Sequence, residues 1–463
     1  MAVWSVVNSS LVSDEGNRID AEYYKPDSLN ATNIIKSLNY KNISELVQDG
    51  YRVVYENTKI LQKTKINIER DARFLQATNI SSDGLWIDIN EIGFVHEIDW
   101  NRYPKGRIKH GEVLIEVKGE AEKVTIVQDY VPERTLVTGT LFKMTLNSIV
   151  SPEYLFAFMN SKYGKLLRNR TKVNTLIAYV SKPELYKIPV YIPSDVEHQN
   201  ITTMIQSSFA LMKQSQTLYK EAEELLEKEL GLDGLEFEKP RSYTAKLSEV
   251  YSHNRCDADF YQTKFRQIEE HINTLETLPL RKISMIQKGF EVGTNAYVDS
   301  GKLFIRVSNF TKNGFSQGGS DKYISDITYA KHIVHKPNIG DILLTKDGTV
   351  GVCYVVDSDI EGIISSGIVK LLPIDETIPK EYLSLVINSK LCQMQIQRDC
   401  SGALIVHWKP EDIRNLKIPI LSEETMNSLA NMVTQSKQAF KQSKQLLEDA
   451  KAKVEAFIEE ASR

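Results

Sequence analysis

Two stretches of the chain repeat apolar or small residues at every seventh position. In the first, which follows Pro193, one register contains Ile201, Ser208, Ser215 and Ala222. In the second, which runs from Ser422 to the C-terminus, the same register contains Leu429, Ser436, Ser443 and Ala450. A period of seven predicts a helix with a coiled-coil seam, so we expect one long helix in residues 194–240 and another in residues 422–463.

A companion register lies three residues after the first one in both helices. The apolar residues of the predicted interhelical seam are Met204, Leu211, Leu218 and Leu225 in the first helix and Leu429, Met432 and Leu446 in the second. Small residues at one seam position let two backbones approach closely, so the simplest partner of each helix is the other helix. The alternative is that each helix packs on its own globular part.

The globular parts repeat as well. The paired segments are Arg18-Ile-Asp-Ala-Glu-Tyr-Tyr24 and Arg255-Cys-Asp-Ala-Asp-Phe-Tyr261, Phe74-Leu-Gln-Ala-Thr-Asn79 and Phe304-Ile-Arg-Val-Ser-Asn309, Gly111–Val117 and Gly340–Lys346, Glu153-Tyr-Leu155 and Glu381-Tyr-Leu383, and Lys187-Ile-Pro189 and Lys417-Ile-Pro419. The offset is 237 positions at Arg18 and Arg255 and 228 at Glu153 and Glu381, so each copy is about 230 residues long. Chance does not produce this many matches in one order.

The repeat and the helices together predict an α+β fold. We expect a tandem pseudo-twofold repeat of two mixed α/β domains, residues 1–193 and 241–421, separated by an antiparallel two-helix coiled coil, residues 194–240 and 422–463. The segments 111–117 and 340–346 each follow a glycine turn and predict a buried strand.

Composition excludes fibrous and disordered classes, because 41% of the 463 residues are apolar and 25% are charged. The net charge of −4 argues at first against a protein dedicated to a polyanion. However, residues 194–240 carry ten acidic and four basic side chains and residues 422–463 carry a net −1, which leaves +3 for the globular parts. The net charge of −4 is therefore an average over parts of unlike charge, and it does not argue against DNA binding by the globular parts.

The four cysteines, Cys256, Cys353, Cys392 and Cys400, are too few and too irregular for a disulfide framework or a zinc ribbon. The N-terminus lacks the pattern of a signal peptide, and no apolar run reaches the ~20 residues that span a bilayer. We expect a cytoplasmic protein without a membrane partner.

Basic and amide side chains in the globular parts suit DNA, because cations position phosphates and Arg or Gln can read base edges. Gln76 and Arg306 are aligned in the repeat and are the candidates for reading adenine and guanine. The candidate DNA-binding residues are Gln76, Asn79, Arg102, Lys105, Arg107, Lys118, Arg168, Arg170 and Lys172 in the first copy, and Arg306, Asn309, Lys312, Lys346, Thr349 and Arg398 in the second. A solvated surface would have a similar composition.

Enzymatic readings find little support. A DNA methyltransferase needs an Asn/Asp-Pro-Pro-aromatic tetrapeptide, and the chain has no Pro-Pro. Glu116 and Lys118, with Asp99 or Glu112, resemble the end of a metal-dependent nuclease motif, but the second copy has Thr345-Lys346-Asp347 there. His332 and His335 lack further metal ligands nearby, and Gly348 and Gly351 lack the Gly-Lys-Ser/Thr ending of a phosphate loop. We predict no catalytic residue and no metal site.

The doubled motif set resembles the specificity subunit of Type I restriction-modification enzymes over essentially the whole chain. Gly340-Asp-Ile-Leu-Leu-Thr-Lys-Asp-Gly348-Thr-Val-Gly351 is similar to the family segment G-D-(I/V)-L-(L/V)-(T/S)-(R/K)-x-G-x-x-G, and His198-Gln199-Asn-Ile201 is similar to the family's E-Q-x-x-I. Two departures concern the first copy, where residues 111–119 lack the Thr-Lys-Asp-Gly core, and the second helix, which begins with Ser422-Glu-Glu-Thr-Met426.

The resemblance implies a non-catalytic subunit in phage defence that reads a bipartite, asymmetric double-stranded DNA target through two target recognition domains. It implies two methyltransferase (modification) subunits as partners, with restriction or translocase subunits as further ones. It implies no cofactor in this chain, and S-adenosylmethionine, ATP and Mg²⁺ on the partner subunits. The alternative is a two-headed protein–protein adaptor without sequence-specific DNA binding.

Overall fold

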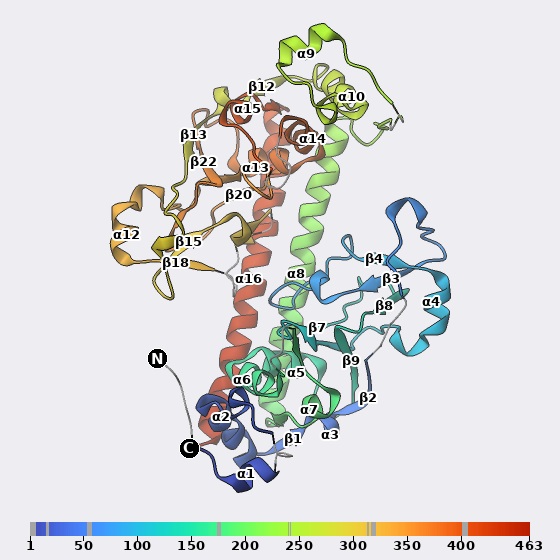
Figure 1. The fold of residues 1–463 in the computed structure, drawn as a ribbon, viewed down its shortest axis with the longest axis vertical. Coiled ribbons are helices and arrows are strands. Elements are labelled where there is room, and N and C mark those ends of the chain that lie inside the picture. Colours follow the sequence, from blue (N-terminus) through green and yellow to red (C-terminus); the bar gives the residue numbers. More distant parts are fainter. Residues whose placement is uncertain are drawn as a thin grey trace. The chain divides into compact units, whose positions relative to one another are not determined.

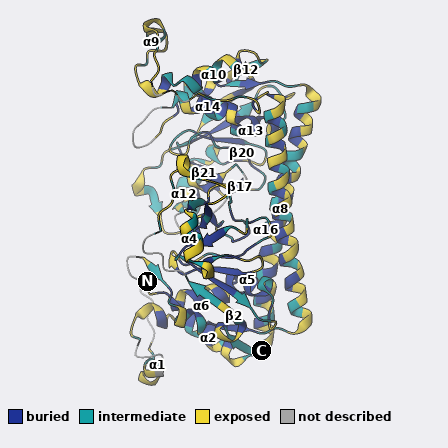
Figure 2. Ribbon diagram, turned by 90° about the vertical axis from the view of Figure 1, so that its right-hand side faces the viewer, coloured by how far each residue is buried: buried dark blue, intermediate teal, exposed yellow. Residues whose placement is uncertain are grey.

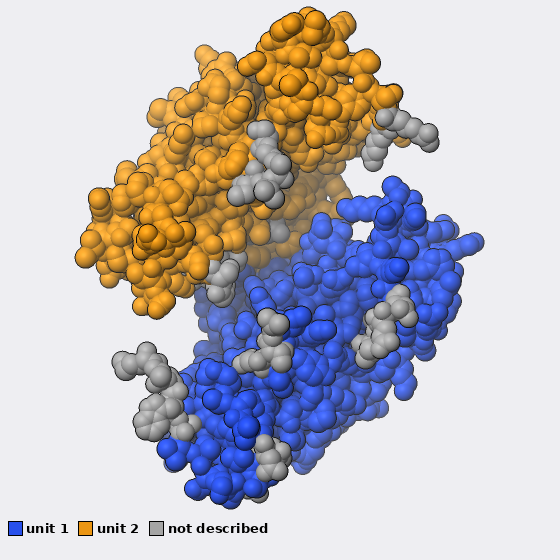
Figure 3. Space-filling model, in the orientation of Figure 1, with its two compact units in different colours: residues 1–213, 441–463 blue, residues 214–440 orange. Residues whose placement is uncertain are grey.

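The computed structural model of the chain describes residues 6–14, 18–52, 58–173, 177–238, 240, 242–312, 314–315, 321–400 and 406–463. The chain forms two compact units, which are described separately (Figure 3). Unit 1 comprises residues 1–213 and 441–463, and unit 2 comprises residues 214–440. Each unit therefore contains one globular part and a section of both long helices. Within the described ranges, no helix is both long enough and apolar enough to cross a membrane.

Among its described residues, unit 1 contains a four-stranded sheet, a three-stranded sheet and two strand pairs, together with the helices that cover them (Figure 1). Its strands are β1 (Tyr40–Asn42), β2 (Val47–Arg52), β3 (Ala72–Leu75), β4 (Gly93–Val95), β5 (Val113–Glu116), β6 (Lys118–Gly119), β7 (Val124–Ile126), β8 (Thr135–Val137), β9 (Leu141–Leu146), β10 (Ala178–Tyr179) and β11 (Pro189–Tyr191). Its helices are α1 (Ser9–Asp14), α2 (Pro26–Ser37), α3 (Ile43–Leu46), α4 (Glu97–Arg102), α5 (Pro152–Asn160), α6 (Lys162–Thr171) and α7 (Lys182–Tyr186), with short 3-10 turns between them.

Unit 2 repeats this arrangement. Its strands are β12 (Thr277–Pro279), β13 (Ser284–Lys288), β14 (Tyr297–Val298), β15 (Lys302–Ile305), β16 (Phe310–Thr311), β17 (Gly314–Phe315), β18 (Lys322–Ile324), β19 (Ile342–Thr345), β20 (Cys353–Val355), β21 (Gly362–Ile364), β22 (Ile368–Pro373) and β23 (Lys417–Pro419). Its helices are α9 (Leu247–His253), α10 (Thr263–Ile272), α11 (Leu280–Ile283), α12 (Asp326–Lys331), α13 (Lys380–Asn388), α14 (Lys390–Asp399) and α15 (Pro410–Asn415).

The two larger sheets of unit 1 recur in unit 2, where β14 adds a fourth strand to the second of them. The antiparallel order β2-β9-β5-β7 of unit 1 becomes β13-β22-β19-β20 in unit 2. The order β4-β3-β8 becomes β18-β15-β21, and the pairs β3–β8 and β15–β21 are both parallel. The predicted α+β tandem repeat is therefore confirmed, and the predicted strands at 111–117 and 340–346 are β5 and β19, whose residues are all buried.

The first motif of the repeat forms the same clamp in both units. Arg18 pairs with Asp20 at 2.5 Å, and the Tyr24 hydroxyl donates to the Arg18 carbonyl at 2.7 Å. Arg255 pairs with Asp257 at 2.6 Å, and the Tyr261 hydroxyl donates to the Arg255 carbonyl, also at 2.7 Å. Each guanidinium also donates to a carbonyl at the end of α6 or α14, that of Lys172 at 2.8 Å or that of Asp399 at 2.9 Å. The motif thus fastens the first described residues of each copy to the C-terminal end of α6 in unit 1 or of α14 in unit 2.

The long helices are α8 (Asp195–Glu229) and α16 (Glu423–Ala461). The first ends eleven residues before the predicted boundary at 240, because Gly231 takes a left-handed conformation (φ 64°) that stops the helix. In unit 1 the helices contact each other through Ser208 and Ser443, and each hydroxyl donates to the other residue's carbonyl at 2.7 Å. Lys453 also donates to Asn200 at 3.1 Å, so the two segments run antiparallel.

In unit 2 the corresponding contact joins Ser215 and Ser436. The Ser436 hydroxyl donates to the Ser215 carbonyl at 2.8 Å, and the two hydroxyl oxygens are 3.2 Å apart. All four serines of these two pairs are buried. The helices also pack on the globular parts, through Phe156 and Phe209 in unit 1, for example, where the ring centroids are 5.2 Å apart. Each long helix therefore packs both on the other long helix and on a globular part.

The predicted seam register needs correction. The second buried register of α8 lies four residues after the first one, at Ile205, Met212, Tyr219 and Leu226. Of the predicted seam residues, Leu429 is fully buried in the core of unit 2. The other predicted seam residues are only half-buried: Met204, Leu211, Leu218, Leu225, Met432 and Leu446. The reason is that each long helix packs on two neighbours, the other long helix and a globular part. The register that faces the globular part is buried more deeply than the predicted companion register, which lies beside the helix–helix contact.

Candidate nucleic-acid interface

Helix α4 of unit 1 is largely exposed (Figure 2). A group of cations and one aromatic side chain gathers on this helix and beside it. We call it the Trp100 cluster; its members are Trp100, Arg102, Lys105, Arg107 and Arg134. His96 caps the N-terminus of α4, and its Nδ1 accepts a hydrogen bond from the Ile98 amide at 3.2 Å. The Arg107 guanidinium lies 4.3 Å from the centroid of the Trp100 ring and donates to the Trp100 carbonyl at 3.0 Å. Contact with the aromatic ring and this hydrogen bond hold the guanidinium in place.

Arg134 reaches the cluster through the sheet. It directly precedes β8, which pairs in parallel with β3, and the Arg73 amide donates to the Arg134 carbonyl at 3.0 Å. The Arg134 guanidinium lies 5.1 Å from the Trp100 centroid and donates to the Arg70 carbonyl at 3.0 Å. Two guanidinium groups therefore flank one indole, and both keep N–H donors suited to a planar anionic group such as phosphate.

The acidic groups of α4 only partly offset this charge. Glu97 lies 3.5 Å from Arg134, and Asp99 lies 3.9 Å from Arg102, at the long end of ion-pair distances. The side chains of Arg102 and Lys105 are exposed. An exposed, loosely paired cation group of this kind favours association with polyanions.

Unit 2 has a different surface at the equivalent place. Tyr329 on α12 occupies the position of Trp100, and Glu361, which precedes β21, occupies that of Arg134. Lys302 forms an ion pair with Glu361, and Lys336 pairs with Asp359 at 2.8 Å. Side chains that project here include Ile327, 83% exposed, and Val334, 63% exposed. This α12 surface therefore combines neutralised cations with exposed apolar groups.

Gln76 and Arg306 occupy the same structural position, at the start of the 3-10 turns Ala77–Asn79 and Val307–Asn309. Both side chains are half-buried. The backbone amide of Gln76 donates to Asn79 Oδ1 at 2.9 Å, and the backbone amide of Arg306 donates to Asn309 Oδ1 at 2.8 Å. Asn79 and Asn309 are buried turn residues, so their prediction as DNA contacts is wrong.

The second basic segment of unit 1 is also not a surface. Arg168 is buried, donates to the Glu122 carbonyl at 2.6 Å, and has its pKa lowered to about 10 by burial. Arg170 is buried against Tyr23, whose carbonyl accepts from its Nε at 3.1 Å. Lys172 is buried 3.5 Å from a Glu122 carboxylate oxygen, and desolvation lowers its pKa. These three cations hold α6 in the unit, and their prediction as DNA contacts is corrected.

Three cations of unit 2 have acidic partners as well. Lys312 pairs with Glu223 of α8 at 2.5 Å, and Lys346 pairs with Asp347 at 2.5 Å. Arg398 bridges Glu269 at 3.1 Å and Asp399 at 2.9 Å. These ion pairs hold the three side chains within unit 2, and the assignment of these residues as DNA contacts stays a prediction. Lys118, at the start of β6, and Thr349, in the loop that follows β19, are both exposed.

The loops after β5 and β19 close differently, as the departure in the first copy suggests. In unit 1 the buried Glu116 carboxylate accepts from the amides of Glu122 and Lys123 at 3.0 and 3.3 Å. In unit 2 the Thr345 hydroxyl accepts from the Val352 amide at 2.9 Å, while Gly348 and Gly351 take positive φ values of 71° and 87°. The Glu116 carboxylate thus accepts hydrogen bonds from backbone amides of its own loop, and this structural role accounts for a glutamate at this position without a nuclease role.

The other metal candidates also have local explanations. Glu112 pairs with the buried Lys143 at 2.5 Å. The His332 and His335 rings lie 3.8 and 5.6 Å from the Phe290 ring centroid, and their own centroids are 6.4 Å apart. No group of three or more His, Cys, Asp or Glu suited to a metal ion occurs in the described part of the chain.

Sequence reasoning missed Arg134 and Trp100 as members of one cluster. Arg134 is 34 positions from Trp100, and only the parallel pairing of β3 with β8 brings it to α4. The repeat contains a signal for this cluster. The residue before β8 is the cation Arg134, whereas the residue before the equivalent strand β21 is the anion Glu361. Such a change is typical of a surface that differs in task between two otherwise similar copies.

No protein-family model matches the sequence, and no curated protein is significantly similar to it. The chain is similar to the S subunit of a Type I restriction-modification system from M. genitalium, with 12% identity, 92% of this chain and 96% of that chain covered, and a TM-score of 0.39.

Two further solved structures are similar. One is a chain from a structure of the type I R-M system concerned with complex assembly and conformational transition (14% identity, 92% and 97% covered, TM-score 0.29). The other is the HsdS subunit from Thermoanaerobacter tengcongensis (14% identity, 92% and 96% covered, TM-score 0.28).

Proposed function

We propose that the chain is the specificity subunit of a Type I restriction-modification complex and reads a bipartite, asymmetric double-stranded DNA target. The observation that carries the proposal is the doubled motif set, which occupies equivalent places in both units. The Arg18 and Arg255 clamps share the contact of arginine with aspartate and the hydrogen bond from the tyrosine hydroxyl, and the Tyr154 and Tyr382 hydroxyls donate to carbonyls of β11 and β23 at 2.8 and 2.9 Å. Each globular part is then a target recognition domain.

The surfaces of the two units support two different half-targets. The Trp100 cluster offers guanidinium groups to phosphates and to guanine edges. The α12 surface offers exposed β-branched side chains, which suit contact with thymine methyl groups, beside paired lysines. Gln76 and Arg306 remain candidates for base reading, since they take the same place in both units with different chemistry.

In this proposal the chain carries no catalytic group and directs the chemistry of partners. Two methyltransferase subunits would bind it, restriction or translocase subunits would join them, and S-adenosylmethionine, ATP and Mg²⁺ would belong to those subunits. An apolar groove of about 780 Å³ on the long helices of unit 1, which includes Val196, Met204 and Leu446, is suited to a partner helix. Leu218 and Met432 are the repeat equivalents of Leu446 and Met204 and are likewise half-buried, which supports one partner per unit.

The test is a binding selection from a random double-stranded DNA library at physiological salt, with the chain alone and with a methyltransferase subunit encoded beside it. The expected product is a consensus with two unlike halves and a fixed number of unspecified base pairs between them. Absence of any sequence preference in both arms would refute the proposal.

The adaptor alternative predicts a different salt dependence. A DNA reader loses affinity steeply as salt rises, because phosphate contacts release counterions. An adaptor would bind its protein partners with little change between 50 and 200 mM salt and would show no specific DNA complex. A salt titration of both interactions therefore separates the two functions.

A further inference from the structure

A short antiparallel bridge in unit 2 places a histidine on the surface. His407 pairs with Asp347, which lies two residues after the end of β19. Next to this bridge, the Trp408 amide donates to the Lys346 carbonyl at 2.9 Å. Trp408 is buried and His407 is exposed. Since neighbouring side chains of an extended segment point to opposite sides, the burial of the indole directs the imidazole outward.

The Asp347 side chain fixes the orientation of this imidazole. His407 Nδ1 lies 2.7 Å from Asp347 Oδ1, and the other carboxylate oxygen of Asp347 is paired with Lys346 at 2.5 Å. An ionised carboxylate only accepts hydrogen bonds, so Nδ1 carries a proton, and Nε2 of the neutral imidazole is then an acceptor. The His407 side chain is 58% exposed, and among the described residues its Nε2 has no hydrogen-bond partner.

Unit 1 has different side chains at the same place. Tyr179 occupies the position of His407, and it pairs with Lys118 in the antiparallel pair of β10 and β6. The Tyr179 hydroxyl is already engaged, because Arg52 donates to it at 2.7 Å. The backbone pairing thus forms in unit 1 without a histidine or an aspartate. The contact of Asp347 with His407 is therefore not needed to hold the two segments together.

The pair of Asp347 and His407 lies beside the turn that begins at Arg306, a candidate for base reading. A methyl group added to Gly367 would lie 3.1 Å from Val307 Cγ2 and 3.6 Å from Asp347 Cβ, so Gly367 separates the turn from Asp347 only narrowly. Gly348, which follows Asp347, is exposed, and no atom lies within 4 Å of the place that a Cβ would take there. Another molecule can therefore approach this backbone closely.

We propose that His407 is a specificity-determining residue of unit 2 that accepts a hydrogen bond from the exocyclic amino group of a base, and that Asp347 is its positioning residue. This inference rests on the proposed DNA-reading function. Each base pair presents one such amino group in the major groove, that of adenine N6 or of cytosine N4. Phosphate oxygens only accept hydrogen bonds, so a backbone contact is disfavoured at the Nε2 acceptor.

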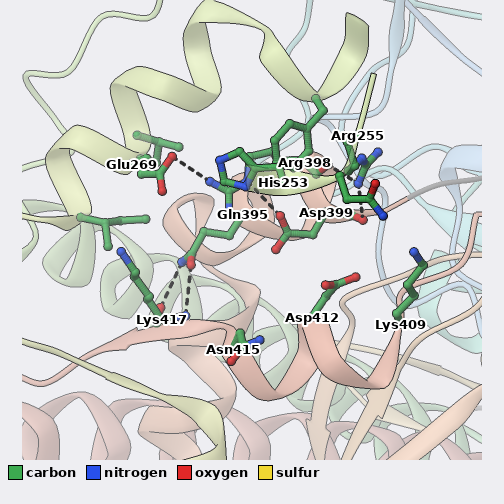
Figure 4. A pocket seen from close by; sticks show the side chains of 14 residues that line it. His253, Arg255, Glu269, Gln395, Arg398, Asp399, Lys409, Asp412, Asn415 and Lys417 are labelled. Atoms are coloured by element: carbon green, nitrogen blue, oxygen red, sulfur yellow. Dashed lines mark hydrogen bonds and ion pairs between the residues drawn. The ribbon is translucent and has the colours of Figure 1, made fainter. Parts of the chain in front are cut away.

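The first test repeats the selection from a random double-stranded DNA library with the full chain and its methyltransferase partner. His407→Ala is expected to lose preference, about fivefold or more, at one base pair of one half-sequence and to keep the other half-sequence. His253→Ala is the matched control, because it removes another exposed imidazole of unit 2. Figure 4 shows His253 in a polar cavity of about 300 Å³, whose lining includes Arg398 and Asp412 but not His407. The control is expected to keep both half-sequences.

The second test deletes the amino group at the base pair that the first one identifies. Purine replaces adenine there, or pyrimidin-2-one replaces cytosine, and fluorescence anisotropy measures the affinity. The deletion is expected to weaken binding by the unchanged chain about tenfold, and binding by His407→Ala less than about twofold, because the variant has lost the contact. Asp347→Asn is expected to behave as His407→Ala does, since the asparagine amide can donate to Nδ1 and leave the proton on Nε2. The melting temperature verifies that each variant is folded.

The inference is overturned if the unchanged chain selects two half-sequences and folded His407→Ala selects both without change. It is also overturned if deletion of the amino group leaves the unchanged chain unaffected, or weakens the unchanged chain and His407→Ala equally. Failure of the unchanged chain to select any sequence would refute the DNA-reading proposal and this inference with it. The two failures are therefore distinguishable.

Discussion

The two units share their internal contacts and differ on one surface. Both have an Arg–Asp–Tyr clamp, a buried serine pair between the long helices, and the same order of strands. At α4, unit 1 places two guanidinium groups on Trp100, whereas at α12 unit 2 places ion-paired lysines and exposed Ile327 and Val334. Contacts that a fold needs are thus repeated, and the groups free to contact something else are not.

This difference has a physical meaning for recognition. Loosely paired arginines such as those of the Trp100 cluster favour any polyanion and gain affinity from counterion release, so the unit 1 surface is expected to dominate the salt dependence. Exposed apolar side chains beside paired lysines add little long-range attraction and act only at contact distance. Unit 1 should therefore contribute more of the affinity and of its salt dependence, while each unit discriminates its own half-target.

The shared helix contact is the place where the units should respond alike. Ser208→Leu in unit 1 and Ser215→Leu in unit 2 each force a large side chain into a buried, closely packed position, at a cost of about 2–3 kcal/mol of unfolding free energy. Denaturant unfolding measures the loss. Ser208→Ala and Ser215→Ala are the controls and should cost about 1 kcal/mol, that of one hydrogen bond. Loss at only one of the two serines would show that the contact is not equivalent in the two units.

The Trp100 cluster should respond unlike its counterpart. Arg107→Ala combined with Arg134→Ala is expected to weaken DNA binding about a hundredfold, or about 2.7 kcal/mol, and to reduce the salt slope by about 2. Fluorescence anisotropy between 50 and 200 mM salt measures both quantities. The matched change in unit 2, Lys302→Ala with Glu361→Ala, removes an ion pair without a change in net charge and should weaken binding less than about threefold. Equal losses would remove the distinction between the surfaces.

The clamps provide a smaller test on stability. Arg18→Ala and Arg255→Ala each leave a carboxylate and a carbonyl without their charged donor, which costs about 2 kcal/mol. Arg18 should matter more, because only Arg18 also holds the α7 carboxylate, that of Glu184. Thermal unfolding of the two variants measures the difference, and a larger loss for Arg255→Ala would contradict it.

The smallest expected effect has opposite signs in the two units. The pKa of Asp412 is raised in the folded chain, so the folded state binds the proton more tightly than the unfolded one and loses stability as pH rises above the ordinary value near 4. Asp412→Asn should therefore raise the melting temperature slightly at pH 7 and leave it unchanged below pH 4. Glu184→Gln breaks an ion pair and should lower the melting temperature at pH 7. The same sign for both variants would show that the two carboxylates have equivalent surroundings in the folded chain.

Much of the fold was predictable because it rests on periodicity and repetition. The seven-residue pattern predicted α8 and α16, and the glycine-led apolar segments predicted β5 and β19. The repeat predicted that the second unit would have the strands of the first. These features depend on residues close in sequence, or on a comparison of one copy with the other.

The candidate interface was less predictable, because charge in a sequence does not reveal burial. Arg168, Arg170 and Lys172 read as a basic surface, but α6 turns them into the unit toward Glu122 and Tyr23. Arg134 joined the interface through a parallel strand pair that no local pattern indicates. The seam register was displaced by one residue, since each long helix has two neighbours whereas a simple coiled coil has one.

The most direct test of the central claim compares two selections from one random DNA library. The unchanged chain is predicted to select two unlike half-sequences at a fixed spacing. The chain with Arg107→Ala and Arg134→Ala is predicted to lose one half-sequence and to retain the other. Loss of both halves together, or selection of no sequence by the unchanged chain, would contradict the account of two recognition domains with separate targets.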